Sequence, residues 1–146
     1  MFYWDDSLIT GIKEIDNEHI ELCKRANKLF DAFVKGNIVE EINFSMNYFE
    51  EYIYAHLKNE EKLQREANFP KYELHKLKHD AFRENFEELK KLVKARGITY
   101  NFVQKFNGTI IEWLSFHLRE DDQELAEYIK TLHKSKINEL NLSNSF

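Results

Sequence analysis

Residues 72–93, YELHKLKHDAFRENFEELKKLV, decide the fold of this chain. Apolar or histidine side chains recur in this stretch every three or four residues, at Tyr72, His75, His79, Phe82, Phe86, Leu89 and Val93. This spacing matches the 3.6 residues of one helical turn, so these side chains share one face of a helix. A long, largely apolar face predicts a helix that packs against other helices in a core.

Three further segments repeat the pattern. Their rows are Ile15, His19, Leu22, Ala26, Leu29 and Phe33; then Ile42, Ser45, Phe49, Ile53 (or Tyr52), His56, Glu60, Leu63 and Ala67; then Val103, Phe106, Ile110, Trp113 and His117, flanked by Leu114, Leu118, Asp122, Leu125, Ile129 and Leu132. Four amphipathic helices joined by short connections predict an all-α, antiparallel up-down four-helix bundle. Because 14% of the residues are aromatic, we expect a core rich in rings.

Glycine and proline residues mark the expected ends of these helices. Gly36 and Gly97 each follow a basic turn, as helix C-caps do, and Pro70 suits a first helical position. Residues 1–15 lack the helical period and predict an extended N-terminal arm that packs on the bundle through Phe2, Tyr3 and Trp4. Asp16 is the expected N-cap of the first helix. The polar tail 138–146 is expected to fray.

Composition narrows the class of protein. A length of 146 residues suits one domain, so we expect a single domain over 1–146. The net charge of −5 argues against a nucleic-acid surface, and no apolar run approaches the roughly 20 residues that a membrane helix needs. The single cysteine excludes an internal disulfide, and the acidic start MFYWDDSLIT is unlike a secretory signal. We therefore expect a cytoplasmic monomer that contacts neither nucleic acid nor a membrane.

Seven polar side chains interrupt the apolar rows near their middles: His19, His56, Glu60, His75, His79, His117 and Asp122. An unpaired polar group costs roughly 2–7 kcal/mol on burial, whereas such a domain has a net stability of only about 5–15 kcal/mol. Five imidazoles and two carboxylates leave ring nitrogens unmatched in a hydrogen-bonded network. A pair of metal ions satisfies the set better, because each ion accepts several lone pairs at once.

The spacing of these residues supports a shared site. The pairs His56–Glu60 and His75–His79 are four residues apart, which places both members on one helix face. Asp122 follows His117 by five residues, which rotates it away from that histidine and toward a second ion. The neighbouring Asp121 follows by four residues, and spacing alone does not exclude it. The flanking row through Leu118 and Leu125 favours Asp122.

Three other side chains are not expected to bind metal. Cys23 lies four residues after His19, but a lone helical cysteine usually behaves as a small buried hydrophobe. His133 lies near the end of the last helix and is expected to be solvated or to interact with the helix dipole. Glu61 points off the apolar row and is expected on a solvated face with the flanking lysines.

The motifs around these residues resemble the hemerythrin family, in its single-domain bacterial form. The resemblance covers nearly the whole chain and runs through Trp4-Asp5-Asp6-Ser7-Leu8, Gly11-Ile12, Glu14-Ile15-Asp16-Asn17-Glu18-His19, His56-Leu57-Lys58-Asn59-Glu60, His75-Lys76-Leu77-Lys78-His79, and Trp113 with His117-Leu118-Arg119-Glu120-Asp121-Asp122. The combined pattern H…HxxxE…HxxxH…HxxxxD is complete. It implies a non-haem di-iron centre, with two iron ions (Fe²⁺ or Fe³⁺) and a bridging oxo or hydroxo group.

The resemblance also implies a role for each residue. One iron would be bound by His75, His79 and His117, and the other by His19 and His56. Both ions would be bridged by Glu60, Asp122 and a solvent-derived oxygen, and the family pattern selects Asp122 over Asp121. The iron that has only two histidines keeps an open position, where dioxygen binds.

The function implied by the resemblance is reversible dioxygen binding for storage, transport or delivery, by an oxygen-binding protein and not an enzyme. Five neutral imidazoles and two carboxylates carry less negative charge than the four carboxylates and two histidines of ferritin-like di-iron sites, so cleavage of the O–O bond is less favoured. The expected walls of the oxygen pocket are Leu22, Trp113 and Leu118, which must keep out solvent and protons.

The alternatives are a di-iron peroxidase or nitric-oxide scavenger, and an oxygen- or iron-sensing module. A sensing module is disfavoured because we expect no second domain. A dinuclear zinc hydrolase is the least favoured, because seven ligands leave little room for a general base.

Overall fold

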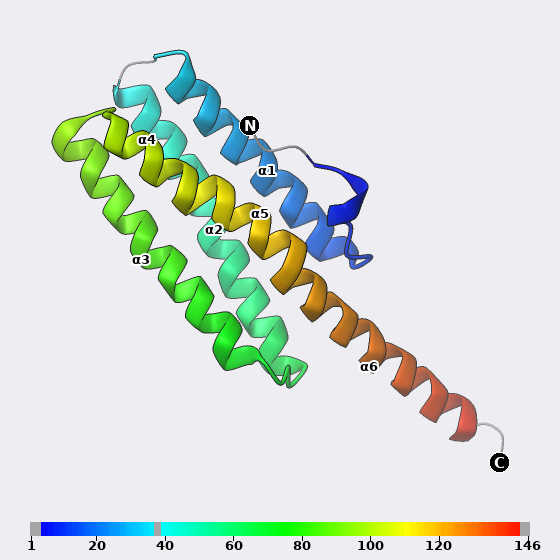
Figure 1. Cartoon of the computed structure of the whole chain (residues 1–146). Coiled ribbons are helices and arrows are strands. Elements are labelled where there is room, and N and C mark those ends of the chain that lie inside the picture. Colours follow the sequence, from blue (N-terminus) through cyan, green and yellow to red (C-terminus); the bar gives the residue numbers. More distant parts are fainter. Residues whose placement is uncertain (1–3, 37–38, 144–146) are drawn as a thin grey trace.

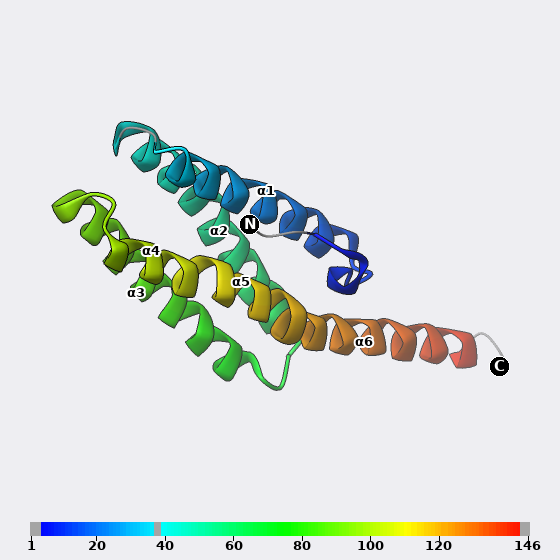
Figure 2. The same cartoon turned by 45° about the horizontal axis from the view of Figure 1, so that its top comes forward.

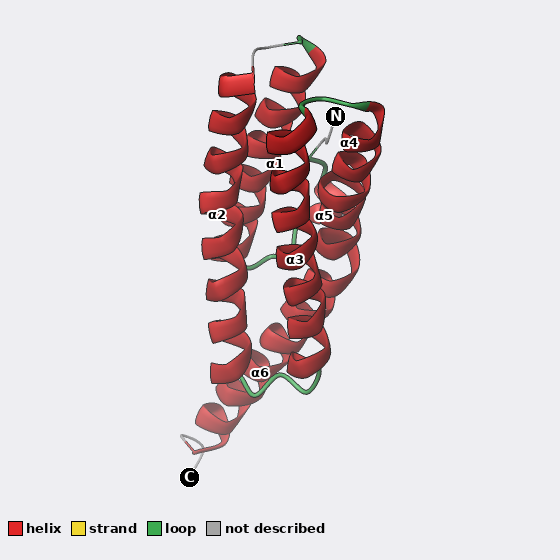
Figure 3. Cartoon of the chain, turned by 90° about the vertical axis from the view of Figure 1, so that its left-hand side faces the viewer, coloured by secondary structure: helices red, strands yellow, loops and turns green. Residues whose placement is uncertain are grey.

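Helices make up most of the described chain, residues 4–36 and 39–143 of this computed structural model. The first three are α1 (Lys13–Val34), α2 (Val39–Glu66) and α3 (Tyr72–Arg96), which run in alternating directions. The fourth rod of the bundle comprises α4 (Tyr100–Phe106), η2 (Asn107–Glu112), α5 (Trp113–Phe116), η3 (His117–Asp121) and α6 (Asp122–Ser143). The predicted all-α, antiparallel up-down bundle is confirmed (Figure 1), and the described part of the chain contains no strand (Figure 3).

The fourth rod departs from a regular α-helix in two places. The segments η2 and η3 are π-helical, so their hydrogen bonds join residues five apart instead of four. In a regular helix, residues five apart differ by roughly 140° around the axis. Because η3 spans Leu118 and its neighbours from His117 to Asp121, the wide turn brings Asp122 back to the side of His117. Asp122 was expected to lie away from this histidine and toward a second ion. It instead lies close to His117, at 3.0 Å from its Nε2, and also reaches His19, at 2.8 Å from the Nε2 of that residue.

The predicted ring-rich core lies at the end of the bundle where α3 passes into α4. Its largest fully buried side chains are Phe49, Phe82, Phe86, Phe102 and Phe106. The ring of Phe86 lies 5.8 Å, centroid to centroid, from those of both Phe49 and Phe82. The rings join α2, α3 and the fourth rod.

No helix in the described ranges is long and apolar enough to cross a membrane.

The boundaries of the helices only partly follow the predictions. Gly97 is the C-cap of α3, with a φ angle of 67°, which confirms that prediction. The C-cap of α1 is Lys35, and Gly36 follows it with a φ angle of 65°. The prediction for Pro70 is wrong, because α3 begins two residues later, at Tyr72.

The N-cap prediction for Asp16 is also wrong, because α1 begins earlier, at Lys13. The carboxylate of Asp16 instead accepts hydrogen bonds from the backbone N and the Oγ1 of Thr10, both at 2.8 Å, and from the backbone N of Gly11 at 3.1 Å. It thus closes the turn that leads into the helix, where Gly11 has a φ angle of 85°.

The predicted N-terminal arm packs on the bundle through Trp4, while Phe2 and Tyr3 lie outside the described residues. The arm ends at residue 12 and not at residue 15 as predicted, because α1 begins at Lys13. Within the arm, η1 (Asp6–Leu8) is a 3-10 turn that buries its last residue completely. The prediction of a frayed tail is wrong as far as residue 143, because α6 continues to Ser143; residues 144–146 are not described. Figure 2 shows α6 extending past the ends of the other helices.

Candidate metal centre

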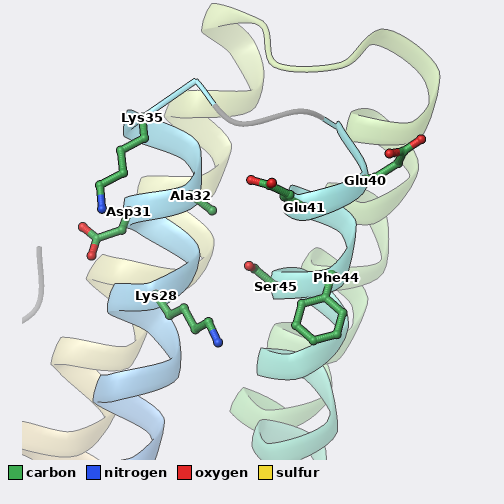
Figure 4. Close-up of a pocket in the computed structure, with 8 residues that line it drawn as sticks. All are labelled: Lys28, Asp31, Ala32, Lys35, Glu40, Glu41, Phe44 and Ser45. Carbon is green, nitrogen blue, oxygen red and sulfur yellow. The ribbon is translucent and has the colours of Figure 1, made fainter.

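A large hollow of about 500 Å³ lies away from the predicted site (Figure 4). It is lined by residues from the C-terminal half of α1 and the first turns of α2, where Glu41 and Ser45 point toward α1. None of the seven predicted polar residues lines it. The volume of a hollow therefore does not identify the functional site in this protein.

The seven predicted polar side chains come together inside the bundle. Their exposed fractions are 0% for His19, 2% for His56, 3% for Glu60, 4% for His75, 0% for His79, 1% for His117 and 0% for Asp122. One comes from α1 and two come from each of α2, α3 and the fourth rod. The amphipathic periodicity of each helix explains this convergence, because every residue of the set lies on a core-facing row.

The first of two groups that are placed to hold a metal ion contains Glu60, His75, His79 and His117. The Nε2 atom of His117 lies 3.4 Å from that of His75 and 3.2 Å from that of His79. Glu60 Oε1 lies 2.8 Å from His75 Nε2 and 3.2 Å from His79 Nε2. Neighbouring ligands lie about 3 Å apart when they share one cation at roughly 2.1 Å, so these separations fit a single ion.

The second group contains His19, His56, Glu60 and Asp122. His19 Nε2 lies 2.8 Å from Asp122 Oδ2, and His56 Nε2 lies 3.3 Å from Glu60 Oε2. Each carboxylate reaches the first group with its other oxygen: Glu60 through Oε1, and Asp122 through an Oδ1 that is 3.0 Å from His117 Nε2. Both carboxylates therefore lie between the two groups.

The hydrogen bonding of these atoms tests whether the residues fit a metal. Buried atoms without a hydrogen-bond partner include both ring nitrogens of His19, Nε2 of His56, and both carboxylate oxygens of Glu60 and Asp122. Some of these atoms lie close together, as His19 Nε2 and Asp122 Oδ2 do at 2.8 Å, but their geometry is not that of a hydrogen bond. Buried polar atoms are rarely left unpaired, and a cation in each group would accept these lone pairs. The residues therefore fit a pair of metal ions.

A further layer of carboxylates contacts the outer ring nitrogens. His79 Nδ1 donates to Glu61 Oε2 at 2.8 Å, and Glu61 also accepts from Arg83 Nη2 at 2.6 Å. The expectation of a solvated Glu61 is wrong: this residue is only 7% exposed, because α3 covers it. A carboxylate at Nδ1 fixes the tautomer and directs the Nε2 lone pair inward.

Asp121 and Glu18 play the same part for two other histidines. Asp121 Oδ2 lies 3.2 Å from His117 Nδ1, and Lys78 donates to the other oxygen of Asp121 at 2.6 Å. Glu18 Oε2 lies 2.5 Å from His56 Nδ1, and its Oε1 accepts from Asn59 at 3.2 Å. Asp121 thus lies behind an imidazole and not in either group.

Sequence reasoning missed this outer layer. A signal was present, because Glu18, Glu61 and Asp121 each stand directly beside a residue of the predicted set. A neighbour in sequence lies roughly 100° away around the helix, where Glu18 and Glu61 each face an imidazole on the adjacent helix and Asp121 faces His117 on its own rod. The identity of that imidazole depends on how the helices pack.

The pKa values of the buried groups show that the carboxylates stabilise positive charge at this site. Burial by itself would lower the pKa of His56 and His75. Contacts with Glu18, Glu60 and Asp122 raise the pKa of His56 to about 10, and contacts with Asp122 and Glu60 raise that of His75 to about 9. Burial would raise the pKa of Glu60, yet the close contacts of its carboxylate with four imidazoles hold it well below its usual range. A metal ion that binds here must therefore displace protons from the imidazoles.

Of the three residues predicted to wall an oxygen pocket, Trp113 contacts a member of the buried polar set. Leu22 and Leu118 are fully buried in the main core, and Trp113 packs against that core. The Trp113 ring stacks on the His117 ring, with centroids 4.4 Å apart and planes 13° from parallel. This arrangement holds the imidazole in place and excludes water from that side.

Two of the excluded residues lie as predicted. Cys23 is buried in the core, and burial raises the pKa of its thiol to about 12, so it is held as an unreactive thiol. His133 is exposed on α6. Neither residue belongs to the two groups that are placed to hold a metal ion.

Comparison with known proteins matches residues 10–129 to the family model described as Hemerythrin HHE cation binding domain. The chain is 29% identical over 133 residues to the Bacteriohemerythrin of Clostridium acetobutylicum, covering 87% of this chain and 100% of that relative. It is 28% identical over 115 residues to the Bacteriohemerythrin of Aquifex aeolicus, covering 79% of this chain and 87% of the relative. The matched segment contains all seven polar residues of the buried set. The chain therefore belongs to the hemerythrin family.

Proposed function

We propose that this protein binds dioxygen reversibly at a non-haem di-iron centre and serves in oxygen storage, transport or delivery. The observation that carries the proposal is the pair of buried groups that share Glu60. Inward-facing atoms of His19, His56, Glu60 and Asp122 in these groups lack hydrogen-bond partners. Membership of a family described by a cation-binding domain supports the same conclusion.

Each iron would be held by its own histidines and by shared carboxylates. The ligands of one ion would be His75, His79 and His117, and those of the other His19 and His56, with Glu60 and Asp122 between them. When bound, the two iron ions supply the electrons that dioxygen takes up on binding and returns on release. The unequal number of imidazoles would leave the second ion with fewer protein ligands, and therefore with room for a small molecule.

The protein's own residues favour release over further chemistry. Five imidazoles bring no negative charge, so the two buried carboxylates are the only anions among the inward-facing ligands. This limits the stabilisation of high oxidation states that cleavage of dioxygen requires. Leu22, Trp113 and Leu118 keep water and protons from the site, which slows irreversible oxidation.

The test is the iron content of the protein combined with its optical spectrum. We expect two irons per chain, a colourless reduced protein, a coloured form in air, and return of the reduced spectrum when oxygen is removed. An iron content well below two in reconstituted protein would contradict the proposed centre. Fast turnover of peroxide or nitric oxide, with a spectrum that does not return, would indicate an enzyme instead.

A further inference from the structure

Two hollows reach the buried centre between different pairs of helices. The first, of about 130 Å³, lies between α1 and α2, and its lining includes Glu14, Glu18, Asn59, His56 and Glu60. The second, of about 170 Å³, lies between α3 and the fourth rod and reaches His75. Because the ligands are almost completely buried, a cation must pass through one of these routes or through a transient opening of the bundle.

The carboxylates of the first hollow form a series from the surface to the centre. Glu14 is exposed, the side chain of Glu18 is 27% exposed, and that of Glu60 is 1% exposed. Glu14 and Glu18 are one turn apart on α1, so they face the hollow together. Its lining contains no lysine or arginine. Its surface therefore attracts cations.

The inner end of this hollow has side chains without partners. Nε2 of His56 and both oxygens of Glu60 are buried and make no hydrogen bond. Glu18 connects them to the outer part, because its Oε2 contacts His56 Nδ1 at 2.5 Å. The hollow thus leads from the exposed carboxylate of Glu14 to atoms of the buried polar set.

The second hollow has a different charge. Its lining carries two lysines and two carboxylates, which neutralise each other as the pairs Lys78–Asp121, at 2.6 Å, and Lys71–Glu124. The only member of the buried set that lines it is His75. A cation therefore meets net attraction at the first hollow and none at the second.

We infer that the hollow between α1 and α2 is the uptake route for the metal, with a transient binding site for a hydrated divalent cation at Glu14 and Glu18. Carboxylate oxygens suit a cation that still carries water, and the imidazole of His56 then suits the dehydrated ion. Carboxylates at the mouth also raise the rate at which cations are captured. This inference rests on the proposed di-iron centre.

The test compares uptake rates after metal-free full-length protein is mixed with Fe²⁺ without oxygen. Free iron is trapped by excess chelator at set times, and the iron retained by the protein is counted. We expect Glu14→Lys to slow uptake about tenfold and Glu14→Gln about threefold, within the range of electrostatic steering. The matched control is Glu124→Lys at the second hollow, which should load at the wild-type rate. Raising the ionic strength should slow the wild type and have little effect on Glu14→Lys.

The final iron content separates this inference from the proposed function. All variants should reach two irons per chain, and thermal unfolding of the metal-free forms should show that they are folded. Equal uptake rates for the wild type and both Glu14 variants would overturn the uptake route while leaving the centre intact. Slowing by Glu124→Lys as large as that by Glu14→Lys would also overturn it. Failure of the wild type to retain two irons would instead contradict the proposed function, and with it this inference.

Discussion

The two halves of the candidate centre differ in how firmly their histidines are held. In the half that contains His79 and His117, the outer carboxylates are themselves paired with Arg83 and Lys78. In the other half, Glu18 behind His56 is bonded to the neutral amide of Asn59.

His19 in that second half has no hydrogen-bond partner at its Nδ1. One half is thus braced by charged pairs and the other is held loosely. We expect the braced half to retain metal and the loose half to exchange ligands, which agrees with the dioxygen site that we propose there.

Removal of an imidazole should have the largest effect on iron content and should reveal the difference between the two halves of the centre. We expect His79→Ala to lose most of both irons, because its loss also disturbs Glu60, which belongs to both groups. His19→Ala should lose mainly one iron, because Glu60 keeps all three of its histidine contacts in the braced half. The measurement is iron per chain after reconstitution, with exposed His133→Ala as the control. Equal iron loading of His79→Ala and His133→Ala would refute the assignment.

Removal of an outer carboxylate should have the next largest effect. Loss of such a partner typically lowers metal affinity 10- to 100-fold, and we expect Glu61→Ala to approach the upper value because it also leaves Arg83 without its buried partner. Glu18→Ala should lie near the lower value, since Glu18 is partly exposed and has no such ion pair. Competition with a chelator measures both affinities. Glu61→Gln should restore part of the loss, because its amide oxygen can still accept from His79; no rescue would indicate that charge alone matters.

We expect the stability of the metal-free protein and its affinity for iron to change in opposite directions as the pH rises. In metal-free protein the pKa values of His56 and His75 are raised from 6.5 to about 10 and about 9, so their stabilisation is fully present below about pH 6.5. It is lost as the pH rises through 9 to 10. Metal binding needs neutral imidazoles, so iron affinity should rise over the same range. Urea unfolding of the metal-free protein and chelator competition give the two trends; parallel trends would contradict the protonated network.

The smallest effect should come from the contact between the arm and the fourth rod. Arg119 in η3 donates to Ser7 at 2.7 Å and lies 3.4 Å from Asp5, but its side chain is 40% exposed. We expect Arg119→Ala to lower the free energy of unfolding by about 0.5 kcal/mol with unchanged iron content. Chemical denaturation measures this change. A large loss of iron would show that the arm positions η3, and therefore His117.

Much of the site was predictable because its signal is local. A histidine or carboxylate on an apolar row lies inside the bundle whichever helices pack beside it, and the seven residues of the set are indeed buried. The exposed face expected for Glu61 was wrong because no rule of spacing indicates that α3 covers that side of α2. Asp122 lies in a group placed to hold a metal ion, as its apolar row favoured, but its contact with His117 was not expected, since the wide turn of η3 is not visible in the apolar period.

The sequence by itself determined the helices, their antiparallel order and the seven polar residues near the middles of the apolar rows. These features follow from helical periodicity, which depends only on residues three and four apart. The tertiary structure alone decided which carboxylate backs which imidazole, that Glu60 and Asp122 lie between the two groups, and which hollow carries net negative charge. These features depend on atoms from different helices meeting within about 3 Å, and that is settled by packing across the bundle.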